Sequence, residues 1–176
     1  MNHIRLVLTA ICMSVIALVI ESVLLPIGLP VELVPEIVLI FVMYISFFQT
    51  NAFGAFLAFL CGLLVDMSSG HLLGPWAGAY VLAFGLVAII SDRVFVESRT
   101  SLSVIAGVLT LLTHIAYLLI SMDPFSHILD ASVLLIGKAI TTAFVAPLFF
   151  PLIRRMLGFS LGEKGKIRKM RRTISP

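Results

Sequence analysis

The longest uncharged stretch of the chain reads IVLIFVMYISFFQTNAFGAFLAFLCGLLV and occupies residues 37–65. As one helix it would be about 43 Å long at 1.5 Å per residue, whereas the hydrocarbon core of a bilayer is about 30 Å thick. The polar segment Gln49–Asn51 in its middle is typical of a tight turn. The sequence therefore predicts a hairpin of two short helices at residues 34–48 and 52–66. A single tilted helix or a re-entrant arm is the alternative.

The composition of the whole chain points to a lipid bilayer as its solvent. Of 176 residues, 60% are hydrophobic and 12% are charged, against roughly a quarter charged in an ordinary soluble domain. A chain of this length cannot bury so much apolar surface and still cover itself with polar groups. The composition excludes a water-soluble globular domain, a disordered chain and a disulfide scaffold.

Proline, glycine and charged residues divide the rest of the chain into four further apolar segments. With the hairpin, they predict an all-α integral membrane protein, a bundle of six transmembrane helices, with five as the alternative. The first segment is interpreted as a retained helix, because no small-residue cleavage site follows it. The expected spans are residues 4–25, 34–48, 52–66, 77–90, 102–120 and 131–153, followed by a basic tail at residues 154–176.

The charges are divided unevenly between the body and the tail. Residues 1–153 hold four Lys/Arg and eight acids, a sum of −4, and residues 154–176 hold eight Lys/Arg and one acid, a sum of +7. Cytoplasmic loops of membrane proteins carry an excess of Lys/Arg. With six spans and both termini in the cytoplasm, eleven of the twelve Lys/Arg lie on the inner side. We therefore predict this orientation.

The tail is a candidate contact for anionic lipid or for an acidic partner. Each Lys/Arg near a membrane surface contributes about 1 kcal/mol of attraction, and a topology signal alone is the alternative. The basic residues of the tail are Arg154, Arg155, Lys164, Lys166, Arg168, Lys169, Arg171 and Arg172.

Lys138 is the one cation clearly inside a predicted span, and His114 lies in the middle of another. Lys138 needs a partner or a route to the interface, because an unpaired charge inside a membrane is costly. An ion pair of Lys138 with Asp66 or Glu21, both expected near the same face, is one interpretation, and snorkelling is the other. His114 is interpreted as a hydrogen-bonded packing residue rather than a proton relay, since no second titratable group lies a helical turn away.

The sequence lacks the usual catalytic and metal-binding patterns. It contains no GxSxG, HExxH, Walker loop or CxxC, and Cys12 and Cys61 both lie in apolar runs. We therefore expect neither an enzymatic activity nor a cofactor or metal.

The stretch GLLVDMSSG at residues 62–70, followed by Leu73 and Gly74, resembles the core motif of the MreD family. The segment Pro35–Ile37, the chain length and the basic C-terminus are also similar to that family. The resemblance implies a non-catalytic scaffold of the bacterial rod-shape (cell-elongation) machinery in the cytoplasmic (inner) membrane. It implies binding to an MreC-like membrane protein, and a direct or indirect link to an MreB-type filament and a peptidoglycan polymerase–transpeptidase pair. No nucleic-acid partner is expected.

The family is also similar in fold to the S-components of energy-coupling-factor vitamin transporters. With this likeness in view, the loop motif is interpreted as a stabilised external loop, or else as a docking surface or pocket mouth. Asp66 is expected to accept hydrogen bonds from the Ser68–Ser69 region or to cap the following turn, and two glycines would permit a tight backbone. The residues of this loop motif are Gly62, Asp66, Ser68, Ser69, Gly70 and Gly74.

Small residues at helical spacing on the third span form a candidate helix-docking face. Gly54, Ala58 and Gly62 would either seat a partner's transmembrane helix or pack within the bundle. The leading hypothesis for function is the cell-elongation scaffold. The alternative is a small-molecule-binding subunit of the vitamin S-component type, which the shortage of polar groups inside the spans disfavours.

Overall fold

The computed structural model describes residues 3–28, 30, 33–70, 73–91, 98–121 and 128–157. Over these residues the predicted all-helical fold with six α-helices is confirmed. A π-helical turn and a 3-10 turn at residues 20–27 continue the first helix. The helices are α1 (His3–Val19), α2 (Ile37–Phe48), α3 (Ala52–Ser69), α4 (Pro75–Ile90), α5 (Arg99–Ser121) and α6 (Ile128–Leu157).

Four segments are long and apolar enough to cross a bilayer, namely Val7–Ile27, Ala52–Ser69, Arg99–Ser121 and Leu134–Ile153. The helices α2 and α4 are also apolar but have 12 and 16 residues. At 1.5 Å per residue they extend about 18 and 24 Å, which is less than the roughly 30 Å of the hydrocarbon core. The chain is therefore an integral membrane protein with helices of unequal length.

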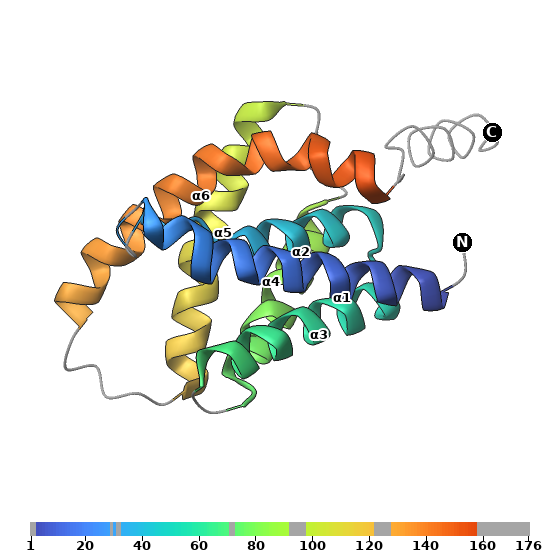
Figure 1. Ribbon diagram of the computed structural model, residues 1–176, viewed down its shortest axis with the longest axis horizontal. Coiled ribbons are helices and arrows are strands. Elements are labelled where there is room, and N and C mark those ends of the chain that lie inside the picture. Colours follow the sequence, from blue (N-terminus) through green and yellow to red (C-terminus); the bar gives the residue numbers. More distant parts are fainter. Residues whose placement is uncertain are drawn as a thin grey trace, which may run out of the picture.

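The helix α2 forms the centre of the bundle (Figure 1). It contains no charged residue, and eleven of its twelve residues are buried. Helices α1, α3, α4 and α6 all pack against it. A helix that is apolar on every side is stable when other helices cover every side, and this accounts for the uniformly apolar sequence of α2.

The chain reverses direction between α2 and α3, at the polar segment where the sequence predicts a turn. Residues 49–51 connect the two helices. Asn51 is the N-cap of α3, and its side-chain oxygen accepts the N–H of Gly54 at 3.1 Å. This cap satisfies one of the N–H groups that the first turn of a helix leaves unpaired. The hairpin is present, and the alternative of one continuous helix is excluded.

The small residues of α3 lie in the interface with α4. A Cβ atom added to Gly62 would lie 2.5 Å from the Cα of Ala77, and one added to Gly54 would lie 2.9 Å from the ring of Phe84. Ala58 is fully buried. Gly54, Ala58 and Gly62 thus pack against other parts of the same chain, and docking of a partner's helix on this face stays a prediction. The alternative, packing within the bundle, is what the structure shows.

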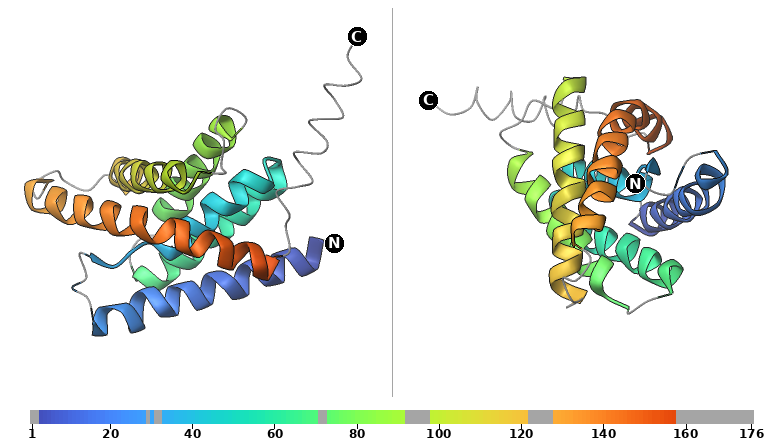
Figure 2. Two further views of the ribbon diagram at one scale, coloured as in Figure 1. Left: turned by 90° about the horizontal axis from the view of Figure 1, so that it is seen from above. Right: turned by 90° about the vertical axis from the view of Figure 1, so that its left-hand side faces the viewer.

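The ends of the helices alternate between two ends of the bundle. The start of α1, the connection between α2 and α3 and the end of α6 lie toward one end (Figures 1 and 2). The end of α1 and the starts of α2 and α4 lie toward the other end. We call this second end the cavity end, because a polar cavity lies there.

Candidate functional site

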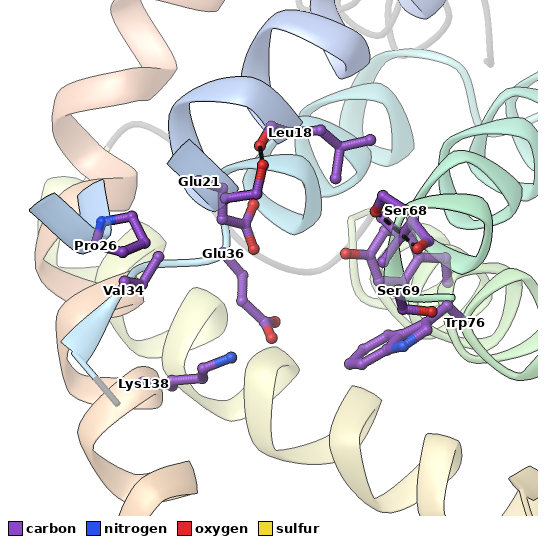
Figure 3. Close-up of a pocket in the computed structure, with 12 residues that line it drawn as sticks. Leu18, Glu21, Pro26, Val34, Glu36, Ser68, Ser69, Trp76 and Lys138 are labelled. Atoms are coloured by element: carbon purple, nitrogen blue, oxygen red, sulfur yellow. Dashed lines mark hydrogen bonds between the residues drawn. The ribbon is translucent and has the colours of Figure 1, made fainter. Parts of the chain in front are cut away.

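A cavity of about 430 Å³ lies at the cavity end of the bundle (Figure 3). Its size falls within the roughly 300–1,000 Å³ typical of small-molecule sites. Apolar side chains of α1, α3 and the segment before α2 form part of its wall. Its polar and aromatic lining residues are Glu21, Ser22, Glu36, Ser68, Ser69, Trp76, Tyr80 and Lys138.

Glu36, the N-cap residue of α2, connects three helices. Its side chain is 4% exposed, and its Oε1 lies 3.1 Å from Nε2 of His114 in α5. Its backbone N–H donates to Oγ1 of Thr142 in α6 at 3.0 Å. Glu36 therefore ties the start of α2 to both α5 and α6.

The hydrogen bonds of His114 define how many protons the Glu36–His114 pair holds. Nδ1 of His114 lies 3.0 Å from the carbonyl oxygen of Thr110. Because a carbonyl only accepts, Nδ1 carries a hydrogen and donates it. The contact between Nε2 and the Glu36 carboxylate then needs one further proton, on either partner. In both cases the pair is neutral overall, as an imidazolium with a carboxylate or as an imidazole with a carboxyl group.

An aromatic ring of α4, that of Trp76, contacts His114. The Trp76 ring stacks on Tyr117 with centroids 4.4 Å apart and presents its edge to His114 at 5.3 Å. Offset and edge-to-face arrangements of this kind stabilise aromatic clusters beyond the area they bury. Trp76 thus forms one wall of the cavity and also holds the imidazole in place.

Asp66 fixes the start of α4 and with it the position of Trp76. It is 1% exposed, and its Oδ2 accepts the N–H groups of Gly74 at 2.9 Å and Ala77 at 3.0 Å. Its Oδ1 accepts the N–H of Trp76 at 3.0 Å. Three backbone donors and the positive end of the helix dipole compensate this buried carboxylate.

The loop motif is therefore organised around the capping role of Asp66. The hydroxyls of Ser68 and Ser69 donate to backbone carbonyls of α3, Val65 O and Asp66 O. The alternative in which the Ser68–Ser69 region donates to the Asp66 carboxylate is not what the structure shows. Gly70 ends α3 at φ 68° and Gly74 precedes α4 at φ 120°, both in the region that favours glycine.

The structure separates Lys138 from Asp66. Lys138 lines the cavity together with Glu21 and Glu36, whereas both oxygens of Asp66 accept N–H groups of α4. Figure 3 shows the Lys138 ammonium turned toward the Glu36 carboxylate. Among the described residues, one pair of oppositely chargeable side chains has a nitrogen and an oxygen within 4.0 Å of each other, and this pair is Glu36 with His114. Pairing of Lys138 with Glu21 stays a prediction, now with both residues on one cavity.

Sequence reasoning missed that Glu36 is the partner of His114. The two residues belong to different segments, so no local spacing connects them. The available signal was the presence of a histidine in the middle of an otherwise uncharged span.

The basic tail is described only at its beginning. Arg154 and Arg155 belong to the last turn of α6, where Arg155 is exposed. The other basic residues predicted to contact lipid or a partner lie outside the described residues, namely Lys164, Lys166, Arg168, Lys169, Arg171 and Arg172.

Comparison with known protein families matches residues 1–159 to the family described as rod shape-determining protein MreD. The matched residues include all six helices and every residue that lines the cavity. No curated protein matches the chain, and no solved structure matches it. The expected likeness to vitamin S-components stays a prediction.

Proposed function

Since the chain belongs to the MreD family of rod shape-determining proteins, we propose that it is a non-catalytic scaffold of the cell-elongation machinery. The family match over residues 1–159 is the observation that carries this proposal. Family membership gives the role in rod-shape determination. The scaffold mechanism, its partners and its place in the cytoplasmic (inner) membrane are the parts that we propose.

In this proposal the chain acts by binding an MreC-like membrane protein. Through that protein, or directly, it positions an MreB-type filament and a peptidoglycan polymerase–transpeptidase pair. The contacts within the bundle support such a role, because Glu36 connects α2, α5 and α6 and Asp66 connects α3 and α4, so that five helices are held in fixed positions. The outer faces of α1 and α5 carry exposed apolar side chains, such as Leu8 and Val104. In a bilayer these faces contact lipid or a partner's transmembrane helix.

The proposed orientation places both termini in the cytoplasm. It follows from the distribution of Lys/Arg, which gathers in the N-terminus, in the segment between α4 and α5 and in the tail. The cavity then faces the outer side of the membrane. The tail contacts anionic lipid of the inner leaflet.

Co-purification from native membranes tests the scaffold mechanism. The tagged full-length chain is extracted in a mild detergent, and bound proteins are identified by mass spectrometry. The matched control is an unrelated multi-span membrane protein with the same tag and the same abundance. Enrichment of an MreC-like protein and other elongation proteins over the control supports the proposal.

The cavity is the one observation that favours the alternative function, a vitamin-binding subunit. In that case the eluate would contain an ATPase pair and a coupling subunit instead. This result would contradict the scaffold proposal.

A further inference from the structure

The cavity contains two carboxylate oxygens whose hydrogen-bonding capacity the described residues leave unused. Oε2 of Glu21 and Oε2 of Glu36 are buried and have no hydrogen-bond partner among these residues. The Glu36 side chain is 4% exposed, so bulk water does not solvate it. Buried polar atoms are normally hydrogen-bonded, and an unpaired one carries a desolvation cost. A hydrogen-bond donor on a ligand inside the cavity would satisfy both oxygens.

The cation of the same cavity lies on a different wall. Lys138 comes from α6, whereas Glu21 comes from the turn that continues α1. Figure 3 shows the two carboxylates and the Lys138 ammonium lining one space, with Trp76 at the right of this view. One ligand can thus contact an anionic and a cationic side chain at the same time.

Beside the Glu36–His114 pair, which is neutral because it shares one proton, the cavity is lined by one acidic and one basic side chain, Glu21 and Lys138. The charges of Glu21 and Lys138 cancel when both side chains are ionised. A ligand with a net charge would leave that charge uncompensated in a poorly solvated place, which is unfavourable. A ligand with one positive and one negative group keeps the site neutral and satisfies both kinds of side chain.

We propose that this cavity binds a zwitterionic group made of a primary ammonium and a phosphate or carboxylate. The ammonium donates to the free oxygens of Glu21 and Glu36, and the anion contacts Lys138. The Trp76 ring lines the same space and provides a favourable surface for a cation. Phosphoethanolamine in a phospholipid headgroup and the same group in a free small molecule both have this chemistry. The inference goes beyond the scaffold role and does not depend on it.

Lipid selectivity of the unaltered protein is the first test. The full-length chain, purified in detergent, is mixed with phosphatidylethanolamine, phosphatidylcholine or phosphatidylglycerol, and bound lipid is counted by native mass spectrometry. We expect one bound phosphatidylethanolamine and at least roughly tenfold weaker binding of the other two lipids, which lack a primary ammonium that donates charge-assisted hydrogen bonds. Free glycerophosphoethanolamine, with glycerophosphocholine as its control, is titrated by calorimetry.

The two arms distinguish the sources of the ligand. Selective binding of the lipid alone assigns the site to a headgroup, and selective binding of free glycerophosphoethanolamine assigns it to a soluble zwitterion. Either result supports the proposed chemistry. Binding without preference for the ethanolamine compound in both arms overturns it.

Substitutions then locate the site. Glu21→Gln and Lys138→Gln each remove one charge from the cavity, and each should weaken binding of the preferred compound by roughly tenfold or more. Arg99→Gln removes an exposed charge at the start of α5, outside the cavity, and should leave the affinity unchanged. Equal affinities for all four proteins would overturn the assignment to this cavity. The comparison of lipids on the unaltered protein stands even where a variant fails to fold.

Discussion

Oε1 of Glu36 lies 3.1 Å from Nε2 of His114, which ties the start of α2 to the middle of α5. His114→Leu removes the partner of a buried carboxylate, and Glu36→Leu removes the partner of a largely buried imidazole. Each substitution should lower the free energy of unfolding by roughly 1–3 kcal/mol. The double variant should lose less than the sum of the two, because it leaves no unpaired group behind. Unfolding by sodium dodecyl sulfate in mixed micelles measures all four proteins.

Cys12→Ser supplies the control for this cycle, because Cys12 is exposed on α1. Combined with His114→Leu, it should give additive losses. If the Glu36→Leu and His114→Leu losses also add to within about 0.5 kcal/mol, the two residues are not coupled.

The cap on α4 should make Asp66 one of the most sensitive positions of the chain. Asp66→Ala leaves three backbone N–H groups, one in a buried and two in part-buried hydrogen bonds, without their acceptor, and we expect a loss of about 3 kcal/mol in the same unfolding assay. Ser68→Ala is the matched control in the loop motif. Its exposed hydroxyl donates to the carbonyl of Val65 within α3, so its loss should stay within about 0.5 kcal/mol. Similar losses for the two variants would show that the cap adds no stability.

The close approach of α3 and α4 predicts a contrast between two glycines. A methyl group at Gly62 would overlap the backbone of α4, whereas one at Gly85 would meet no atom within 4 Å. Gly62→Ala should therefore cost about 1–3 kcal/mol of unfolding free energy. Gly85→Ala should be neutral or stabilising by up to about 1 kcal/mol, because alanine favours a helix. A fully stable Gly62→Ala variant that no longer co-purifies with an MreC-like protein would support the docking interpretation.

The features that could be predicted from the sequence are the local ones. The turn at residues 49–51 could be predicted because the polar residues that cap α3 interrupt an uncharged stretch. The capping role of Asp66 was one of two expectations for a short motif. The carboxylate of Asp66 and the N–H groups that it accepts lie within eleven residues of each other in the sequence. Local spacing and turn chemistry contain this information.

The long-range contacts of the candidate site could not be predicted in this way. Glu36 meets His114 and Thr142 only after α2 is enclosed by α5 and α6. The spacing of Gly54 and Gly62 equally suits a partner's helix and a helix of the same chain, because close packing needs small residues in both cases. Only the arrangement of the helices distinguishes these two interpretations.

Thiol labelling in intact cells tests the proposed orientation. In a chain with Cys12 and Cys61 replaced by alanine, Thr50→Cys lies in the exposed connection between α2 and α3, and Leu73→Cys replaces a side chain that is 68% exposed at the cavity end. A membrane-impermeant maleimide should label Leu73→Cys in intact cells and Thr50→Cys only after the inner membrane is opened. The reverse pattern would contradict the orientation derived from Lys/Arg placement.

Cell shape is the most direct test of the central claim that this chain is a scaffold for rod-shape determination. The measurement is the length-to-width ratio of rod-forming cells that are depleted of their own MreD family protein. These cells belong to the species to which this chain is native, and they express either the unaltered chain or a variant of it. The account predicts that the cells regain their rod shape and that Asp66→Ala, which loosens the bundle, restores it poorly. Cells that stay round while the unaltered chain is folded and inserted in the membrane at a normal level would contradict the claim.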